Sequence, residues 1–284
     1  MAGVVTLGEC MVSLIAAEVG PLSEATNFQR HLAGAEANVA VGLARLGCRV
    51  AFLGRVGNDG FGTAVTRGLR GEGVDVTQLY VDTKAPTGVM FRERRALGPA
   101  QVVYARKGSA GSRLAPEDVI RAEAEDFFGA RWLHVSGVTL AISSSARAAV
   151  GHAVRSARHA GLTISLDINH RRRLWSDAEA ATTLRGIAHQ VDVVLGSPDE
   201  LALVAGTTTH DPELLVREVA AMGVTTVIAK LGPGGALVLH QDDDLLQVGG
   251  LAVGQVLDPI GAGDAFCAGF IAGRLAGADL ADAI

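Results

Sequence analysis

From residue 116 onward, strand patterns and helix patterns alternate along the chain. Short strand-like runs, most of them rich in apolar residues, alternate with longer amphipathic segments. The runs lie at 132–136, 163–167, 191–195 and 225–230, and the helical segments at 116–127, 144–160, 177–189, 212–222 and 262–276. Such strands need cover on both faces, which helices between parallel strands provide. The alternation therefore predicts a doubly wound α/β fold with a mostly parallel sheet, to which residues 236–240 and 245–248 add a hairpin.

The region from residue 77 to residue 106 has a different pattern. Three strand patterns, at 77–81, 88–95 and 101–106, follow one another with Pro and Gly turns and no helix between them. Consecutive strands of this kind predict an antiparallel meander. Ahead of it we expect strands at 4–8, 11–15 and 49–53 and helices at 36–46 and 61–69. No repeat or linker divides residues 1–284, so we expect a single α/β domain that carries a small β flap.

Charge and composition argue against several classes of partner. The chain has a formal net charge of −5, and nucleic-acid binding requires clustered Lys and Arg. No apolar run reaches the roughly 18 residues of a membrane span, and no basic segment precedes the apolar N-terminus, so we expect neither a membrane anchor nor a signal peptide. Cys10, Cys48 and Cys267 show no CxxC spacing. We therefore expect free thiols in a reducing compartment and a cytoplasmic protein.

Glycine is unusually frequent, with 36 in 284 residues, where average usage is about 7%. This predicts tight strand-to-helix turns and backbone that approaches ligands closely. In a doubly wound sheet, ligands bind beyond the carboxyl ends of the strands, where these turns lie. The sequence contains no GxxxxGK[ST], GxSxG or HExxH. Gly261 begins a GxG that lacks the third glycine of a dinucleotide fingerprint.

The segment 258–266, DPIGAGDAF, carries the strongest chemical signal. Gly261, Ala262 and Gly263 open a predicted helix, and the first amide N–H groups of a helix have no partner within it. With the helix dipole, these groups form an anion site. Asp264 lies in the same turn, and an ionised acid beside an anion site suits phosphoryl transfer to a hydroxyl. An ordinary helix start that Asp264 helps to cap explains the same residues.

Other turns are also rich in glycine. Gly34 precedes a predicted helix that carries Asn38, and residues 54–62 form a turn after a strand. Backbone is open to a nucleotide at the end of the strand 225–230, which offers Lys230, Gly232, Gly234 and Gly235. Each of these turns, taken alone, has a purely structural explanation.

In this order and at these spacings, the segments resemble the ribokinase-like carbohydrate kinases, or PfkB family, over essentially the whole chain. The resemblance implies that ATP and Mg²⁺ are required. It makes Asp264 the catalytic base and residues 261–263 the anion hole, with Gly34 and Asn38 on the sugar. The turn 232–235 and Lys230 would line the ATP site. The flap corresponds to the family's β lid, formed mainly by about 77–106 plus the strand near 11–15, which excludes water from the site.

Within the family, the chain is most similar to 2-keto-3-deoxygluconate kinases. The similarity lies in the segments 8–12, 104–110 and 167–175. A keto-acid sugar carries a carboxylate, which guanidinium groups bind bidentately. Arg106 and Arg171 are the candidates for this contact, and Tyr104 for a sugar hydroxyl. Arg171 could instead meet ATP phosphates or belong to a solvated basic turn, and Tyr104 could pack under the lid.

The sequence departs from the family pattern at several points. The usual Asn-x-x-Glu becomes Ser197-Pro198-Asp199-Glu200. The hydroxyl of Ser197 can reach a water or a phosphate, and Glu200 fits a contact to Mg²⁺ through water. Pro259 replaces the more common Thr, which removes a hydroxyl and an N–H donor. The chain ends at Ile284, earlier than typical members, so we expect a truncated chain or an unusually open adenine pocket.

The leading interpretation is an ATP-dependent kinase that phosphorylates a primary hydroxyl of a sugar acid, namely the 6-hydroxyl of 2-keto-3-deoxygluconate. A fructokinase or ribokinase-like enzyme for a neutral sugar is the alternative, but such a sugar gives two guanidinium groups no partner. A non-catalytic sugar-binding homologue would have no need of Asp264. A nucleoside kinase is disfavoured because only 4% of residues are aromatic. The exposed edge of a lid sheet would accept a partner subunit, so a homodimer or higher homo-oligomer could form there.

Overall fold

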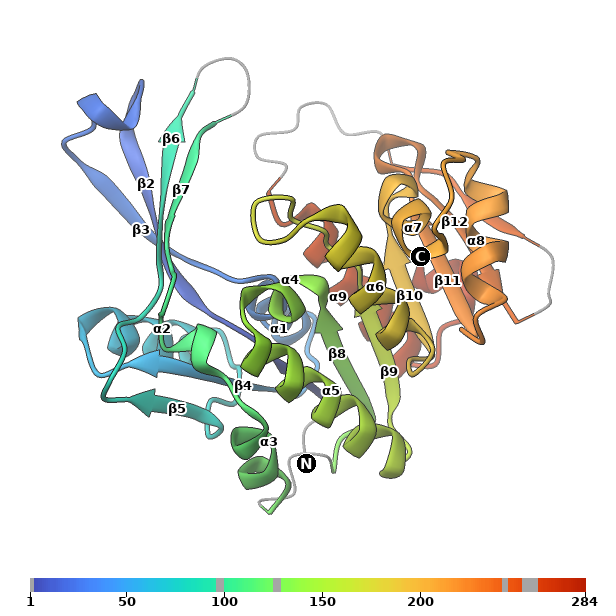
Figure 1. Cartoon of the computed structure of the whole chain (residues 1–284), viewed down its shortest axis with the longest axis horizontal. Helices are drawn as coiled ribbons and strands as arrows, with labels where there is room; N and C mark the ends of the chain where they lie inside the picture. Colours follow the sequence, from blue (N-terminus) through green and yellow to red (C-terminus); the bar gives the residue numbers. More distant parts are fainter. Residues whose placement is uncertain (1–2, 96–99, 125–128, 242–244, 252–259) are drawn as a thin grey trace.

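The computed structural model describes residues 3–95, 100–124, 129–241, 245–251 and 260–284. These residues form a large sheet flanked by helices and a small sheet that projects from one side of it (Figure 1). The large sheet has the strand order β13-β12-β11-β10-β9-β8-β1-β4-β5, and the small sheet has the order β3-β2-β6-β7.

The large sheet is parallel except at one edge. Its strands are β1 (Val4–Leu7), β4 (Val50–Gly57), β5 (Leu79–Asp82), β8 (Trp132–Ser136), β9 (Thr163–Asp167), β10 (Val193–Gly196), β11 (Thr226–Lys230), β12 (Ala236–His240) and β13 (Leu246–Val248). All neighbours from β5 to β11 pair in parallel, whereas β12 and β13 form the expected antiparallel hairpin. The predicted doubly wound, mostly parallel sheet is confirmed.

Helices cover both faces of this sheet. One face carries α3 (Pro116–Glu123), α4 (Gly137–Ile142), α5 (Ser144–His159), α6 (Asp177–Ala188), α7 (Pro198–Ala205) and α8 (Pro212–Ala220). The other carries α1 (Ala35–Arg45), α2 (Gly60–Gly71), α9 (Ala262–Leu275) and α10 (Leu280–Ala283). The sequence patterns did not predict α4 or α7, because six and eight residues are too few to show a clear helical period.

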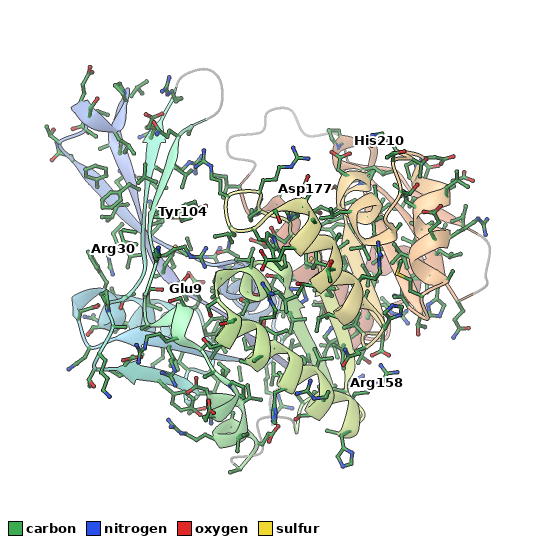
Figure 2. The ribbon with its side chains drawn as sticks, viewed as in Figure 1. Glu9, Arg30, Tyr104, Arg158, Asp177 and His210 are labelled. Carbon is green, nitrogen blue, oxygen red and sulfur yellow. The ribbon has the colours of Figure 1, made fainter. Side chains whose placement is uncertain are left out.

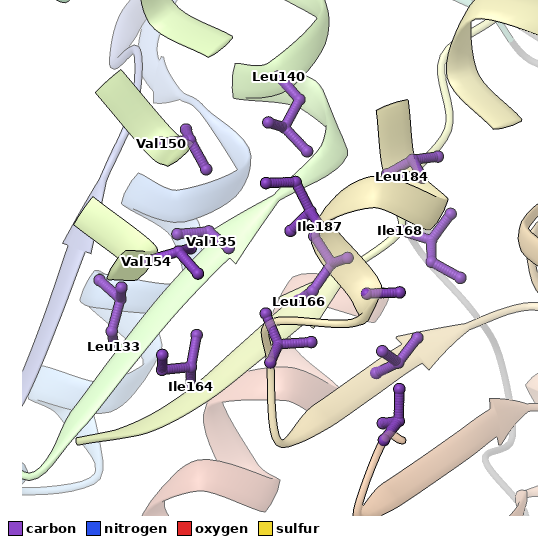
Figure 3. Close-up of a cluster of buried hydrophobic side chains, with 14 of the residues drawn as sticks. Leu133, Val135, Leu140, Val150, Val154, Ile164, Leu166, Ile168, Leu184 and Ile187 are labelled. Atoms are coloured by element: carbon purple, nitrogen blue, oxygen red, sulfur yellow. The ribbon is translucent and has the colours of Figure 1, made fainter. Parts of the chain in front are cut away.

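Each face has its own hydrophobic core. In Figure 3, Val150 and Val154 of α5 face Leu133 and Ile164 of the sheet, and all four side chains are fully buried. Burying a side chain of this size stabilises the fold by about 1.5–3 kcal/mol relative to leaving it exposed. The second core lies beneath α1, α2 and α9. These two cores hold the strand ends in fixed positions, and the candidate site lies at those ends.

The small sheet, which we call the lid, contains β2 (Met11–Val19), β3 (Phe28–Ala33), β6 (Val89–Arg94) and β7 (Val102–Ala105). It rises from the body at the left of Figure 1. β2 pairs antiparallel with β3 and parallel with β6, and β6 pairs antiparallel with β7. The expected lid is present, and the strand near residue 11 belongs to it.

The predicted meander from 77 to 106 is wrong in its first strand. Residues 79–82 form β5, which pairs in parallel with β4 at the edge of the large sheet. The helix α2 joins these two strands, and such a strand-helix-strand unit returns to the same sheet as its first strand. The fourth lid strand is instead β3, which the sequence patterns missed. Its first four residues are exposed and include Gln29, Arg30 and His31, so no apolar alternation marks it.

Several expectations fall outside the described residues. These are the turn at 98–99, the end of the helix predicted at 116–127, the acidic turn at 242–244, and Asp258 and Pro259. In the part of the chain that the structure describes, we find no helix with the length and apolar character that crossing a membrane requires.

Candidate active site

The carboxyl ends of β1, β9, β10 and β11 and the starts of α1 and α9 open onto one cavity of about 840 Å³. The lid strands β2, β6 and β7 contribute residues to the same cavity. Most of the site residues predicted from sequence line it: Gly34, Asn38, Tyr104, Arg106, Arg171, Ser197, Glu200, Lys230, Gly232, Gly261, Gly263 and Asp264. Ala262, Gly234 and Gly235 are not among the lining residues. The fold thus joins segments from both halves of the chain in one place.

The helix α9 begins at Ala262, directly after Gly261. Gly261 has φ 82°, a left-handed conformation that glycine adopts without strain. No side chain caps this helix start, so its first amide groups are available to a ligand. Asp264 lies in the first turn and is only 7% exposed. The start of α9 therefore places uncapped amide groups beside a buried acid.

Two amide side chains hold the carboxylate of Asp264. Asn38 Nδ2 donates to Oδ2 at 2.7 Å, and Asn169 Nδ2 donates to Oδ1 at 3.2 Å. Burial raises the pKa of Asp264, while the bond from Asn38 and the charges of Arg171 and Lys230 oppose that rise. Asn169 has φ 38°, an uncommon conformation for a residue other than glycine. This conformation places its amide beside the acid that it contacts.

Lys230 crosses from the end of β11 to the end of β9. Its Nζ donates to Oδ1 of Asp167 at 2.7 Å, and Asp167 is almost fully buried. Among the described residues, the second carboxylate oxygen of Asp167 accepts only from the weak thiol donor of Cys267, at 3.6 Å. Lys230 is therefore the principal partner of a buried negative charge, and it also lines the cavity.

Gly34 lets the start of α1 pack closely against the segment that connects the body to the lid, at Glu9 and Cys10. A methyl group on Gly34 would lie 2.3 Å from the carbonyl oxygen of Glu9, a separation that no side chain tolerates. Glycine here lets the first turn of α1 approach the chain between β1 and β2. Asn38 follows in that turn and reaches Asp264, which explains why these two predicted residues lie in one site.

Arg106 lies where the lid strand β7 returns to the body. Its guanidinium forms an ion pair with Glu9, and Ser109 Oγ also donates to Glu9. Glu9 is fully enclosed, and a methyl group on Gly111 would lie 2.3 Å from its Cγ. Figure 2 shows Glu9 near the base of the lid and Tyr104 farther out on it. Tyr104 is 42% exposed, so it does not pack as a core residue under the lid.

The arginines at 171–173 have different environments. Arg171 is exposed and lines the cavity. Arg172 lies 3.5 Å from Asp177, with a side chain that is 82% exposed, which fits the solvated basic turn expected for part of this run. Arg173 Nη1 donates to the carbonyl oxygen of Val102 in β7 at 2.7 Å. Arg173 thus connects the body to the lid.

Ser197 and Glu200 form the start of α7. Ser197 Oγ accepts from the amide of Glu200 at 3.4 Å, and Glu200 Oε2 accepts from the amide of Ser197 at 2.8 Å. The other oxygen of Glu200 accepts from the amide of His170 at 2.7 Å. This reciprocal capping gives Ser197 a structural role in place of the usual Asn. Within the described residues, no group of three or more His, Cys, Asp or Glu side chains could hold a metal ion.

Comparison with known proteins decides the family. A family model described as "pfkB family carbohydrate kinase" matches residues 1–284. The chain belongs to the PfkB family of carbohydrate kinases. It is therefore a phosphotransferase with an alcohol group as acceptor, and its predicted ribokinase-like fold is confirmed.

Two curated relatives of this kinase are 2-dehydro-3-deoxygluconokinases, an equivalent name for 2-keto-3-deoxygluconate kinases. The protein from Thermoproteus tenax is 38% identical over 98% of this chain and 84% of its own length. The protein from Bacillus subtilis is 38% identical over 99% of this chain and 85% of its own length. A putative ribokinase II from E. coli, solved in complex with ATP and Mg²⁺, superposes with a TM-score of 0.90 at 29% identity, covering 100% of this chain and 89% of that chain.

Sequence reasoning missed three residues of the kinase site. Glu9, Asp167 and Asn169 all lie within segments that carried the family resemblance, but they were not singled out. Asp167 ends the strand β9 and Asn169 follows it closely, and this position is the signal that could have found them. Glu9 follows the strand β1 and carries the same signal, but its contact with Ser109 could not be predicted, because the two residues lie 100 positions apart in the sequence.

Proposed function

We propose that this kinase transfers the γ-phosphoryl group of ATP to the 6-hydroxyl of 2-dehydro-3-deoxygluconate. One observation carries the proposal: a single cavity is lined by the start of α9 with Asp264 and by the guanidinium groups of Arg106 and Arg171. The first pair suits phosphoryl transfer, and the second suits a substrate with a carboxylate. The 38% identity to two kinases of that name supports the same substrate.

Asp264 is the general base of the proposed reaction. The hydroxyl oxygen of the sugar forms a bond to the γ-phosphorus, and the bond from that phosphorus to the β–γ bridging oxygen breaks. ADP leaves with the electron pair, and the hydroxyl proton passes to the carboxylate of Asp264. The amides of residues 261–263 stabilise the charge on the transferring group. Asn38 and Asn169 hold the carboxylate in place for this transfer.

The other predicted site residues bind either the sugar acid at one end of the cavity or the nucleotide at the other. Gly34, Asn38, Tyr104, Arg106 and Arg171 bind the sugar acid, with the arginines on its carboxylate. Ser197, Lys230, Gly232, Gly234 and Gly235 form the nucleotide side. Gly235 packs against β13, where a methyl group would lie 2.0 Å from the carbonyl oxygen of Val248, so it shapes the turn without touching the cavity.

Mg²⁺ fits this site as an ion held mainly by the phosphates of ATP. Mg²⁺ usually keeps several waters and is bound by one or two carboxylates together with substrate phosphates. Glu200 lines the cavity and can contact such a water, because each of its oxygens has a second lone pair beyond the amide bonds described above. When bound, Mg²⁺ neutralises charge on the phosphates.

A kinase of a neutral sugar is the second candidate, and one observation favours it. Glu9 already balances the charge of Arg106, so this guanidinium does not require a substrate anion. Arg171 has no such carboxylate among the described ion pairs. An ADP-release assay with ATP and Mg²⁺ separates the candidates when 2-dehydro-3-deoxygluconate, fructose, ribose and adenosine are compared. We expect turnover of the sugar acid alone. Turnover of fructose or ribose instead would support the kinase activity but would show that the sugar acid is not the substrate.

We also propose that the chain folds as a single kinase domain over residues 1–284, works in the cytoplasm and associates through the lid. Its three cysteines are free, which suits a reducing compartment. The lid exposes Val19, Phe28 and Val103, at 64%, 38% and 44%, and apolar side chains on an exposed sheet favour a partner. Light scattering of the wild type and of Phe28→Glu tests the association. A dimer that the variant dissociates supports it, and a wild-type monomer would exclude it.

A further inference from the structure

Lys230 lies beside the anion site at the start of α9. A methyl group on Gly263 would lie 3.4 Å from Lys230 Nζ, so the ammonium faces the first turn of the helix. The side chain of Lys230 is 18% exposed, and both residues line the cavity. A positive side chain and the free amides of a helix start therefore act on the same point. Each favours a negative charge there, and their effects add.

Asp167 keeps this ammonium charged and in place. Burial alone would lower the pKa of Lys230, but the charge of Asp167, its hydrogen bond to Lys230 and the charge of Glu200 together oppose burial, and the pKa is raised. Asp167 is 2% exposed and accepts from Lys230 Nζ at 2.7 Å. An unpaired carboxylate at this depth would be strongly unfavourable, so the pair is present before any nucleotide arrives. Both residues end strands of the large sheet, which fixes their positions.

We propose that Lys230 is a catalytic residue whose ammonium contacts the transferring phosphoryl group, and that Asp167 is the positioning residue that aims it. This inference rests on the proposed kinase function but not on the identity of the sugar. As the phosphorus moves from the β–γ bridging oxygen to the sugar oxygen, its equatorial oxygens stay beside Lys230 and the amides of α9. Lys230 donates hydrogen bonds throughout and gives up no proton, because the hydroxyl proton goes to Asp264. The contact is to the γ-phosphoryl group, so ADP lacks it.

The competing explanation is that Lys230 only neutralises Asp167. Two variants separate these explanations: Lys230→Met, and the double variant Lys230→Met with Asp167→Asn, which removes both charges. Lys84→Met is the matched control, because Lys84 is exposed and lies outside the cavity of about 840 Å³. We expect the double variant to unfold near the wild-type temperature and yet to show kcat lowered by about 10²-fold or more, the usual loss for one electrostatic donor. Recovery of kcat to within threefold of the wild type would overturn the proposal.

Calorimetric binding of ATP and of ADP without sugar gives a second readout. We expect the double variant to bind ADP within about threefold of the wild type and to bind ATP at least tenfold more weakly. An equal loss for both nucleotides would place Lys230 on the α- or β-phosphate and overturn the proposal, as would no loss for either. Because this comparison needs no acceptor, it decides the role of Lys230 even if the sugar acid proves to be the wrong substrate.

Discussion

At each end of the cavity, a cationic side chain forms an ion pair with a buried carboxylate. At the lid end, Arg106 forms an ion pair with Glu9, and at the body end Lys230 forms one with Asp167. Both carboxylates are almost fully buried, with side chains 1% and 2% exposed. Each cation is therefore charged, neutralised and positioned before a ligand binds. Positioning in advance reduces the entropy that binding must overcome.

The difference between the pairs lies in what they connect. Glu9 follows β1 of the body, while Arg106 follows β7 of the lid, so this pair spans the joint between the two sheets. Lys230 and Asp167 both end strands of the large sheet. In the proposed function, sugar recognition therefore involves the joint with the lid, whereas phosphoryl transfer involves two strands of the large sheet. Phosphoryl transfer depends mostly on positioning, which a rigid sheet provides.

The largest effect should come from the acid at the rigid end. Asp264→Asn keeps the size of the side chain but removes the base, so we expect kcat to fall by about 10²–10⁴-fold. The sugar KM should change by less than about threefold, because the lid is untouched. Steady-state kinetics measure both quantities. Asp199→Asn is the control, because Asp199 is exposed and contacts only His210 among the described side chains. If Asp264→Asn retained near wild-type kcat, the proton would go elsewhere.

The buried carboxylate of Glu36 differs from those of Glu9 and Asp167, because a hydroxyl and not a cation contacts it. Ser136 Oγ donates to Glu36 at 2.8 Å, and burial raises the pKa of Glu36 to about 7. A raised pKa means that the charged form is disfavoured in the folded state. Its stability contribution is full below the unfolded pKa of 4.5 and is lost as pH rises through about 7.

Replacing Glu36 with Gln should therefore matter only at high pH. We expect Glu36→Gln to raise the free energy of unfolding by roughly 3 kcal/mol at pH 8.5 and to leave it nearly unchanged at pH 4.5. Urea unfolding at the two pH values measures the difference. An equal effect at both would mean that packing, and not the charge, decides. Glu179→Gln on the exposed face of α6 is a control, and we expect no comparable pH-dependent gain from it.

The next effect concerns the lid end. Arg106→Met removes a charge-assisted contact worth about 1.5–3 kcal/mol, so we expect the sugar KM to rise by about 10–100-fold. The KM for ATP should stay within about threefold, because Lys230 and the start of α9 are unchanged. Initial-rate kinetics with each substrate varied in turn test this split. A rise in the KM for ATP alone would reverse the assignment of the two ends.

The smallest effect should come from the contact between the two parts. Arg173 donates one hydrogen bond to Val102 of the lid, and such a bond contributes about 0.5–1.5 kcal/mol. We expect Arg173→Met to raise the sugar KM by about two- to tenfold, without a change in ATP binding. Arg70→Met is the control, because Arg70 is exposed and is not among the residues that line the cavity. If both variants changed the sugar KM equally, the hydrogen bond between Arg173 and Val102 would have no specific role in sugar binding.

The sequence predicted the body more accurately than the lid, for a physical reason. The strand expected at 163–167 is β9 residue for residue, because Ile164 and Leu166 alternate with polar residues between two clear helical segments, a pattern typical of a strand. The lid strand β3 is exposed over most of its length, so no hydrophobic pattern distinguishes it. Residues 77–81 show the converse error, since a strand pattern does not reveal which sheet a strand joins.

In the candidate site, too, features that are local in sequence could be predicted, and contacts between distant segments could not. The start of α9, with Gly261 and Asp264, is local in sequence, so a glycine-rich helix start beside an acid could be predicted from spacing alone. The arginine at 106 was also predicted, but its ion pair with Glu9 was not. That pair depends on how the lid meets the body, which is a property of the packed fold. Ser197 shows a related limit, because its reciprocal bonds with Glu200 depend on where α7 begins, and that helix was not predicted.

One measurement tests the central claim, that the lid end recognises a carboxylate while the body end transfers phosphate. It compares kcat/KM for 2-dehydro-3-deoxygluconate with that for the analogue in which CH₂OH replaces the carboxylate, in the wild type and in Arg106→Met. We predict that the wild type prefers the acid by about 10²-fold, the value of a charge-assisted contact, and that Arg106→Met reduces this preference to about fivefold or less. A wild type that uses both substrates equally, or a variant that keeps the full preference, would contradict the account.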